Sequence, residues 1–342
     1  MQKKSSNYII YQIHLMEARQ KNLHLQHLDG TSILEHAQEH FGSYFNGAML
    51  DLYKKNKDGE ITRHPNDILQ KIDDVILLRV NNVQMKSVYL REDNPGGGVP
   101  DYKEKKFESN PYSYVIIDNR PGVCQMAIEK SSTWSGSTDA VRDLLEEWFK
   151  DRLGADYNLD IFIDMKWQES EFWEYVEQRF RDTGDVITQF KFDILNQNKV
   201  TPTVQSEQPM SGMVKAVYDA TKLMNALKAS ITMETAGEHI QKAEKKYEDI
   251  MQMVRLCSQN TYQLSVTFRD YGEYKCNDLV KAMFPLDDKT FNNFLHPEPE
   301  ISETKPEGEY RLIKWLDNIL KETANFNDGN KIGRKAKEKG KK

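Results

Sequence analysis

Short runs rich in branched and aromatic residues constrain the fold of this chain more than any other sequence feature. Such runs occupy residues 8–15 (YIIYQIHL), 112–118 (YSYVIID), 159–167 (LDIFIDMKW) and 186–194 (VITQFKFDI). Their length and composition are typical of β-strands. Segments with apolar residues at helical spacing lie between them, so we expect an α+β fold with a mixed β-sheet in residues 1–200.

Turn residues predict two β-hairpins in this region. Asn81 and Asn82 separate β-rich residues 74–79 from residues 83–89, and asparagine tolerates the positive φ that a tight hairpin turn requires. A second hairpin is expected where the sequence NRPG at 119–122 joins residues 112–118 to residues 123–130.

Two other segments of the first half have clear local patterns. Apolar residues recur every three or four positions over residues 31–53, which predicts a helix. Residues 92–110 contain NPGGGVP followed by a run of charges, so we expect an exposed loop there.

Strands and helices alternate after residue 130. Helices are expected over residues 138–153 and 169–181, and the strands at 159–167 and 186–194 follow them. The order strand, helix, strand predicts a βαβ unit with a right-handed crossover.

The C-terminal half has a more helical pattern. Apolar stripes over residues 213–227 and 240–254 predict a pair of antiparallel helices, and a partner surface on these helices is an alternative use of the same stripes. Residues 262–269 are a further strand candidate that we expect to return to the first sheet, followed by a short helix over residues 277–284. The predicted division of the chain is an α+β sheet domain (1–200), a helical hairpin with a returning strand and short helix (201–296), an acidic proline-rich linker (297–309), a docked amphipathic helix (310–325) and a disordered basic tail (326–342).

Composition excludes several classes of protein. A chain of 342 residues with 38% hydrophobic and 10% aromatic residues can fill one large or two modest cores, so a wholly disordered chain is excluded. No apolar run approaches the roughly 18 residues that a membrane helix needs, and the N-terminal residues do not form a signal peptide. Three cysteines without a CxxC pair argue against a disulfide framework and a thiolate zinc site. We therefore expect a cytoplasmic protein without membrane contact.

Charge is distributed unevenly along the chain. The net charge is -6, and the last twelve residues contain seven cations and one acid, so the tail carries +6 and the other 330 residues carry -12. Such a tail is either a nucleic-acid-binding arm or a solvated end. The tail has no aromatic residue that could stack on a base, so any contact it makes is with phosphates. The candidate nucleic-acid-binding residues are Lys331, Arg334, Lys335, Lys337, Lys339, Lys341 and Lys342 of the tail, with Lys103, Lys105 and Lys106 of the expected loop.

The strand at residues 159–167 ends in Asp164-Met165-Lys166, a D-x-K sequence. Over these three residues and the preceding helix that contains Glu146, the chain resembles metal-dependent nucleases of the PD-(D/E)xK family. The resemblance implies that Asp164 would hold Mg²⁺ and that Lys166 would orient or stabilise the attacking water. Asp160 is a candidate for the second acid. A charged strand end that contacts solvent is the other interpretation of these residues.

His36 and His40 lie in the sequence HAQEH, which matches the HxxEH pattern of zinc hydrolases. Two histidines one helical turn apart can bind one metal ion, with the glutamate acting on a bound water. A solvated amphipathic helix explains the same residues.

These observations lead to three hypotheses about function. The first is a non-enzymatic binding or assembly component that contacts nucleic acid or a protein partner and needs no cofactor. The second is a Mg²⁺-dependent nuclease or phosphodiesterase that uses Asp164 and Lys166. The third is a scaffold that forms homo-oligomers through the helices of residues 213–254. A bacterial defence-type system would suit such a chain, although no residue indicates one.

Overall fold

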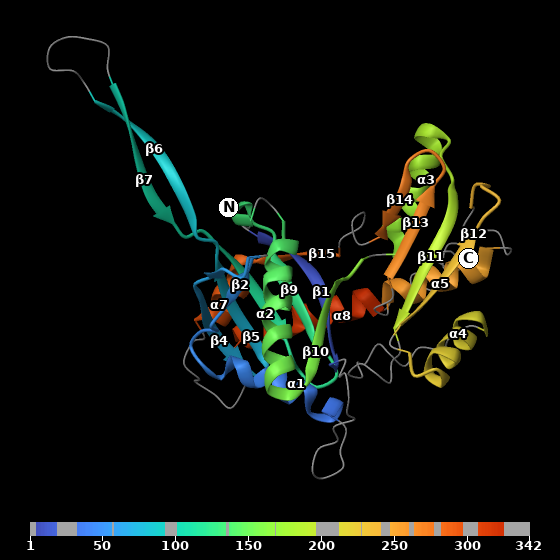
Figure 1. Ribbon diagram of the computed structural model, residues 1–342, viewed down its shortest axis with the longest axis horizontal. Coiled ribbons are helices and arrows are strands. Elements are labelled where there is room, and N and C mark those ends of the chain that lie inside the picture. Colours follow the sequence, from blue (N-terminus) through green and yellow to red (C-terminus); the bar gives the residue numbers. More distant parts are fainter. Residues whose placement is uncertain are drawn as a thin grey trace, which may run out of the picture.

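The structure of the protein is a computed structural model with two β-sheets and a long two-stranded ribbon (Figure 1). It describes residues 5–18, 33–56, 58–92, 101–134, 137–167, 169–195, 212–226, 228–240, 247–259, 263–276, 282–296 and 307–324. None of the described helices is long and apolar enough to cross a membrane.

The larger sheet has seven strands, and its described pairings are all antiparallel. Its order is β10-β1-β9-β8-β5-β4, and β15 also pairs with the start of β1. The long strand β1 can hold three neighbours because β15 pairs with its first residues and β10 with its last. The strands are β1 (Ser5–Glu17), β4 (Asn66–Ile72), β5 (Val75–Asn81), β8 (Tyr112–Asp118), β9 (Gln125–Glu129), β10 (Leu159–Met165) and β15 (Met283–Asp287).

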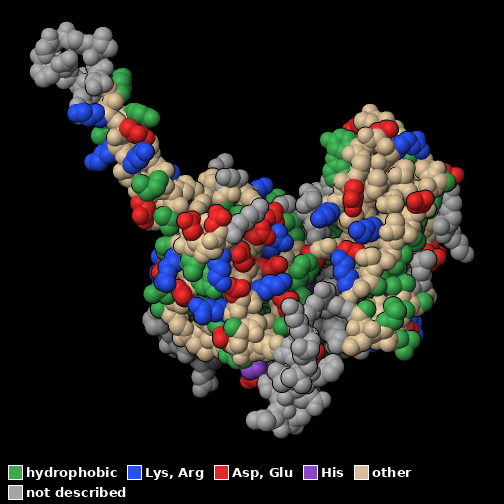
Figure 2. Space-filling model, in the orientation of Figure 1, with side chains coloured by type: hydrophobic (Ala, Val, Ile, Leu, Met, Phe, Trp, Pro, Cys, Tyr) green, Lys and Arg blue, Asp and Glu red, His purple; other side chains and the backbone are tan. Residues whose placement is uncertain are grey.

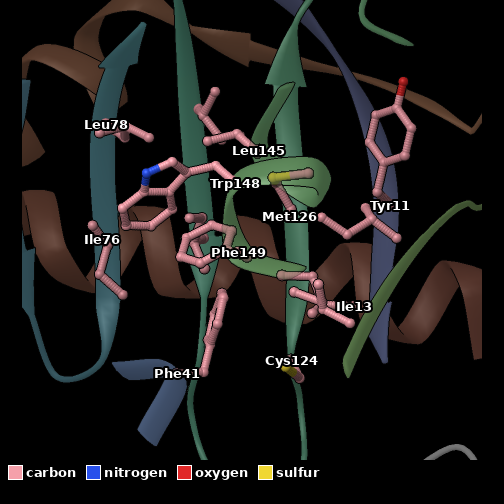
Figure 3. Packing of buried hydrophobic residues seen from close by; sticks show 14 of the residues in the cluster. Tyr11, Ile13, Phe41, Ile76, Leu78, Cys124, Met126, Leu145, Trp148 and Phe149 are labelled. Atoms are coloured by element: carbon pink, nitrogen blue, oxygen red, sulfur yellow. The ribbon is translucent and has the colours of Figure 1, made fainter. Parts of the chain in front are cut away.

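The helix α2 (Asp139–Tyr157) covers one face of this sheet, and its buried side chains form the first core with alternate residues of the strands (Figure 3). Tyr11 and Ile13 of β1 point into this core, where Trp148 and Phe149 of α2 meet Phe41. Phe41 belongs to a short helical region made of η1 (Ile33–His36), α1 (Ala37–Ser43) and η2 (Tyr44–Asn46). Burial of these aromatic rings stabilises the layer by roughly 2 to 3 kcal/mol for each side chain.

Two C-terminal helices, α7 (Asp288–Leu295) and α8 (Glu307–Ala324), cover the opposite face of the larger sheet (Figure 1). The α8 side chains that are buried here, Leu312, Leu316 and Ile319, pack against Tyr8 and Ile10 of β1. Tyr8 and Ile10 alternate along β1 with the residues that point into the first core, so they lie on the opposite face of the sheet. The predicted docking of an amphipathic helix near residues 310–325 is therefore confirmed.

The smaller sheet has the order β12-β11-β13-β14 and its own core. Its strands are β11 (Ile187–Leu195), β12 (Lys228–Glu234), β13 (Gln263–Phe268) and β14 (Gly272–Lys275), and its helices are α3 (Glu169–Thr183), α4 (Gly212–Leu223) and α5 (Glu248–Gln259). Phe190 and Phe192 of β11 pack with Phe172 and Trp173 of α3 in this core.

The ribbon consists of β6 (Gln84–Glu92) and β7 (Asp101–Ser109), which pair over nine positions and project from the larger sheet (Figure 1). The backbone N–H of Asn82 donates to the carbonyl oxygen of Pro111 at 2.7 Å, so the two strands are held together where they leave the body. A smaller hairpin, β2 (Tyr53–Lys55) with β3 (Ile61–Arg63), lies beside α2.

The α+β class predicted from the sequence is confirmed, but several local predictions are wrong. The β10, α3, β11 segment is not a βαβ unit, because β10 pairs in the larger sheet and β11 in the smaller one. The chain changes sheets at Trp167, whose ring is buried in the second core. The strand β13 does not return to the first sheet, since its partners are β11 and β14.

The predicted hairpin around Asn81 and Asn82 is also wrong. The strand β5 pairs with β4 and β8, because its side chains are buried on both faces and both edges need partners. The strand β6 instead pairs with β7, so most of the expected loop at 92–110 is strand, and residues 93–100 lie outside the described part. The hairpin formed by β8 and β9 is confirmed.

Three helix predictions need correction. The helical region that begins at Ile33 ends at Asn46, and Tyr53 already belongs to β2. The strand β12 separates α4 from α5, and these helices pack on the smaller sheet instead of forming a simple helix pair. Residues 283–284, expected to end a helix, begin β15, while residues 277–281 and the linker at 297–306 lie outside the described residues.

Candidate functional site

Asp164 and Lys166, the predicted catalytic pair, lie at the end of β10, which is an edge strand of the larger sheet. Both side chains are buried, each with 6% of its surface exposed. The backbone of Lys166 is held on both sides, because its N–H donates to the carbonyl oxygen of Ile10 and its carbonyl oxygen accepts from the N–H of Ala282. The end of this strand is therefore enclosed. This excludes the other interpretation, in which Asp164 and Lys166 are charged side chains that contact solvent.

Asp164 belongs to a row of four buried polar side chains that crosses the larger sheet. Gln12 of β1 is opposite Asp164 on one side and opposite Gln125 of β9 on the other, and Gln125 is opposite Asp118 of β8. Residues that are directly opposite in paired strands share a face. This polar row lies on the face that α8 covers, because Gln12 is two residues from Ile10 in β1 and so shares the face of Ile10, which belongs to the core beneath α8.

Hydrogen bonds link the members of the row to one another and to neighbouring elements. Gln125 Nε2 donates to Asp118 Oδ2 at 3.3 Å. Gln12 Nε2 donates to the carbonyl oxygen of Cys124 at 2.8 Å. Gln263 of β13 donates from Nε2 to Asp164 Oδ1 at 3.0 Å, so the row also connects the two sheets.

Arg120 closes the row at the Asp118 end. Its Nε and Nη2 atoms donate to the two oxygens of the Asp118 carboxylate, each at 2.8 Å. Nη2 also donates to Asp317 Oδ1 of α8 at 2.8 Å. This arrangement neutralises a carboxylate that is completely buried and ties α8 to the sheet.

Burial shifts the protonation equilibria of the ionisable groups in this region. It raises the pKa of Asp164 to about 7, against the opposing effects of the Gln263 hydrogen bond and the charge of Arg142. Burial lowers the pKa of Lys166 to about 7, although the negative charge of Asp118 opposes that change. His14, two residues beyond Gln12 on the same face, has its pKa lowered to about 3 by burial and by the charge of Lys166.

Two buried polar atoms, one beside the row and one within it, have no hydrogen-bond partner among the described residues. They are Nε2 of His14 and Oε1 of Gln125. A buried polar atom without a hydrogen-bond partner lowers the free energy of unfolding. These two atoms therefore show that the side chains of this region are not arranged for maximal stability.

Asp160, the candidate second acid, is not close to Asp164. It lies four residues earlier in β10, a separation of about 13 Å along an extended strand. Its Oδ1 atom is 3.3 Å from Nζ of Lys150 in α2. Asp160 therefore lies apart from Asp164 and Lys166, whereas the charge of Asp118 does act on Lys166.

The two histidines proposed as metal ligands are separated by other contacts. His36 Nδ1 lies 2.9 Å from Glu39 Oε2, and the ring of His40 stacks on Tyr157 with 4.1 Å between centroids. The centroids of the two imidazole rings are 6.3 Å apart. Within the described ranges, no group of three or more His, Cys, Asp or Glu side chains could hold a metal ion.

The candidate nucleic-acid-binding lysines fall into two groups. Lys103, Lys105 and Lys106 lie on β7 of the ribbon, and all three are exposed. Figure 2 shows basic side chains along the projecting ribbon. The lysines and arginine of the tail, residues 331–342, lie outside the described residues.

The ribbon carries a concentration of exposed apolar side chains that sequence reasoning missed. Their exposed fractions range from 41% to 67%, and they are Met85, Val88, Tyr89, Leu90, Tyr102 and Phe107. The sequence indicates a β-rich run at residues 83–89, but Val88, Tyr89 and Leu90 are consecutive, so no alternation of apolar and charged residues indicates that these side chains are exposed.

The fold and these sites define a two-sheet α+β protein with a buried polar row and a projecting ribbon. Comparison of the chain with protein-family models, with curated proteins and with solved structures finds no match.

Proposed function

We propose that this chain is a binding component that engages a macromolecular partner, a nucleic acid or a protein, through its β6–β7 ribbon. The observation that supports the proposal is the ribbon itself, nine paired positions long with six large apolar side chains exposed on its two faces. Large apolar side chains gathered on a surface are typical of interaction sites. An isolated two-stranded hairpin is marginally stable in water, so contact with a partner would stabilise this one.

Removal of the ribbon tests the proposal. Asn82 and Pro111 are already joined by a backbone hydrogen bond, so residues 84–109 can be replaced with a short Gly-Ser turn. We expect the shortened chain to unfold in urea at the same midpoint as the intact chain within about 0.3 M, because the ribbon adds no side chain to the three cores.

Binding measurements on the two chains then decide the outcome. Fluorescence anisotropy with labelled DNA and RNA reports nucleic-acid contact, and light scattering over a concentration series reports self-association. We expect the intact chain to show at least one of these interactions and the shortened, folded chain to show neither. Equal binding by both chains would refute a role for the ribbon.

A second candidate function is Mg²⁺-dependent phosphodiester cleavage by Asp164 and Lys166. The observation in its favour is that two buried ionisable side chains, two residues apart, both have pKa values moved to about 7, since strongly shifted pKa values are frequent at functional sites. We expect any cleavage of labelled DNA or RNA in Mg²⁺ to be lost in Asp164→Ala and kept in Asp160→Ala, because Asp160 lies away from the pair. Binding without cleavage in the intact chain would exclude this candidate.

A further inference from the structure

The strand β12 forms an outer edge of the smaller sheet, next to β11 (Figure 1). It is seven residues long and pairs with β11 over its whole length. Among the residues that the structure describes, no strand pairs with its other side. An unpaired strand edge presents a row of backbone N–H and C=O groups to which another strand can add.

The pairing with β11 determines which backbone groups of β12 face outward. The N–H of Thr235, directly after β12, donates to the carbonyl oxygen of Thr188 in β11 at 2.8 Å, so this residue faces β11. Hydrogen-bonded and non-hydrogen-bonded pairs alternate along an antiparallel ladder, so alternate residues of β12 direct their N–H and C=O groups away from β11. These outward-facing residues are Lys228, Ser230, Thr232 and Glu234.

The edges of the larger sheet are occupied by contacts of the chain itself. At the edge of β10, the N–H of Ile163 donates to Oε2 of Glu146 at 2.8 Å, and Nη1 of Arg142 donates to the carbonyl oxygen of Ile163 at 3.3 Å. At the edge of β4, the N–H of Ile68 donates to the carbonyl oxygen of Ala48 at 2.8 Å. Within the described ranges, the outward-facing backbone groups of β12 make no such contact. The edge of β12 is therefore open to a strand from outside the chain.

The sequence of β12, KASITME, is complementary to itself in the antiparallel direction. When two copies are aligned about Ile231, each residue before it lies opposite the residue at the same distance after it in the second copy. Such an arrangement has two-fold symmetry, the commonest symmetry of protein dimers. The resulting pairs are Lys228 with Glu234, Ala229 with Met233, Ser230 with Thr232, and Ile231 with Ile231.

Each face of the paired strands then has favourable contacts. On the exposed face, Lys228 meets Glu234 at both ends, and the hydroxyl groups of Ser230 and Thr232 meet between them. On the core face, Ile231 meets its own copy in a non-hydrogen-bonded pair, where side chains approach most closely. Ile231 is only half-buried at the margin of the second core, so pairing removes more of its apolar surface from water.

Lys228 has a partner within the chain, which the second copy does not displace. Its Nζ atom is 2.6 Å from Oδ2 of Asp193, while 42% of the side chain is exposed. An ammonium group has three donors, so it can bind Asp193 and the glutamate of a second copy together.

We propose that the β12 edges of two copies of this chain pair antiparallel and form a symmetric dimer. The two smaller sheets then become one continuous sheet across a two-fold axis at Ile231. This inference goes beyond the proposed role of the ribbon, because β12 belongs to the smaller sheet and the ribbon projects from the larger one. A dimer carries two ribbons, so a partner with two contact points is bound by both.

Thr232→Pro tests the backbone pairing. Proline lacks the N–H that faces the second copy, and a strand tolerates it where the N–H faces outward, so the ladder with β11 is kept. Light scattering over a concentration series gives the dimer dissociation constant, which we expect to rise by about a hundredfold because symmetry removes two hydrogen bonds. Thr232→Val keeps the N–H and is the matched control, which should dimerise like the unmodified chain.

Charge reversal tests the register. Glu234→Lys places lysines opposite each other at both ends, so we expect the dissociation constant to rise by about tenfold. Glu273→Lys makes the same change at an exposed position of β14 and should have no effect. A mixture of Glu234→Lys with Lys228→Glu chains restores opposite charges at both ends and should associate more strongly than either variant alone. Circular dichroism of each variant shows whether the fold is retained.

The outcomes distinguish this inference from the proposed function. Folded Thr232→Pro chains that dimerise as strongly as the unmodified chain would overturn the pairing of β12, and so would an unmodified chain that stays monomeric throughout the series. If Thr232→Pro does not fold, equal dissociation constants for Glu234→Lys and the unmodified chain would overturn it. Association that is lost with the ribbon but kept in Thr232→Pro would identify the ribbon as the contact.

Pairing through β12 does not need the ribbon, so the intact and shortened chains are compared in the Thr232→Pro background. In that background, the interactions that remain are those of the ribbon. A dimer of the unmodified chain, without any ribbon-dependent interaction in Thr232→Pro, would refute the proposed function and support the pairing of β12.

Discussion

Replacement of Arg120 by alanine is expected to destabilise the protein by about 3 to 5 kcal/mol. Asp118 is completely buried, and Arg120 pairs with both of its carboxylate oxygens. Without the guanidinium, the carboxylate keeps, among the residues that the structure describes, the longer hydrogen bonds from Nε2 of Gln125 at 3.3 Å and from the backbone N–H of residue 120 at 3.4 Å. A buried charge without its partner is among the few single changes that remove a large part of the stability of a domain.

Urea unfolding of Arg120→Ala measures this effect, and Asp317→Asn is the matched control. Asp317 also pairs with Arg120, but 41% of its side chain is exposed. A half-exposed ion pair contributes about 0 to 1 kcal/mol, so the control should remain close to the unmodified chain. Addition of Asp118→Asn to Arg120→Ala removes the uncompensated charge and should recover part of the loss. A loss below 1 kcal/mol in Arg120→Ala would contradict the assigned role of this pair.

The stability contributed by Asp164 and Lys166 is expected to pass through a minimum near pH 7. Since burial raises the pKa of Asp164 from 3.8 to about 7, the folded chain keeps a proton that the unfolded chain releases between pH 4 and 7. Stability therefore falls as pH rises through that window, in total by on the order of 4 kcal/mol. Because burial lowers the pKa of Lys166 from 10.5 to about 7, the unfolded chain binds a proton that the folded chain lacks between pH 7 and 10.5. Stability rises with pH through that second window.

Variants separate the two limbs of this pH profile. Urea unfolding of Asp164→Asn should lack the contribution that falls between pH 5 and 7, since the amide oxygen still accepts from Gln263 and does not ionise in this range. The lowered pKa of His14 makes its own contribution rise with pH below about 6.5 in both chains, so the stability of Asp164→Asn relative to the unmodified chain should increase as pH rises from 4 to 7. Lys166→Met should lose the rise between pH 7 and 9 and should be more stable than the unmodified chain at pH 7. Asp160→Asn is the control on the same strand, because its partly exposed side chain should leave both limbs in place. Equal slopes in all four chains would contradict the assignment.

Local patterns in the sequence identified many elements, and long-range pairing explains most of the errors. The strands β1, β8, β10 and β11 and the helices α2, α3 and α8 have continuous patterns of branched or amphipathic residues, which local chemistry is sufficient to predict. The strand β12 was missed because its sequence, KASITME, follows a helical stripe without a clear break. Which strands pair depends on residues far apart in the sequence, and neither the partners of β5 nor those of β13 are visible in their own residues.

The candidate sites show the same distinction. Asp164 and Lys166 were identifiable from the D-x-K sequence, but their burial, and the proximity of Asp118 and His14, depend on how β1, β8, β9 and β10 align. In the sequence, Gln12 and His14 only interrupt an apolar run, and nothing local links them to Asp118. The lysines of residues 103–106 were found as charges, whereas their separation onto two faces follows from the strand register of the ribbon.

The sequence by itself determined the α+β class, the positions of the strongly patterned elements and the contrast between an acidic body and a basic tail. These properties depend on residue type and on spacing within a few turns or a few strand residues, so they are present before the chain folds. The tertiary structure alone decided the division into two sheets, the polar row beneath α8 and the projecting ribbon of β6 and β7. Each of these arises from the pairing of strands, and a strand acquires its neighbours only when distant segments bury their apolar faces together.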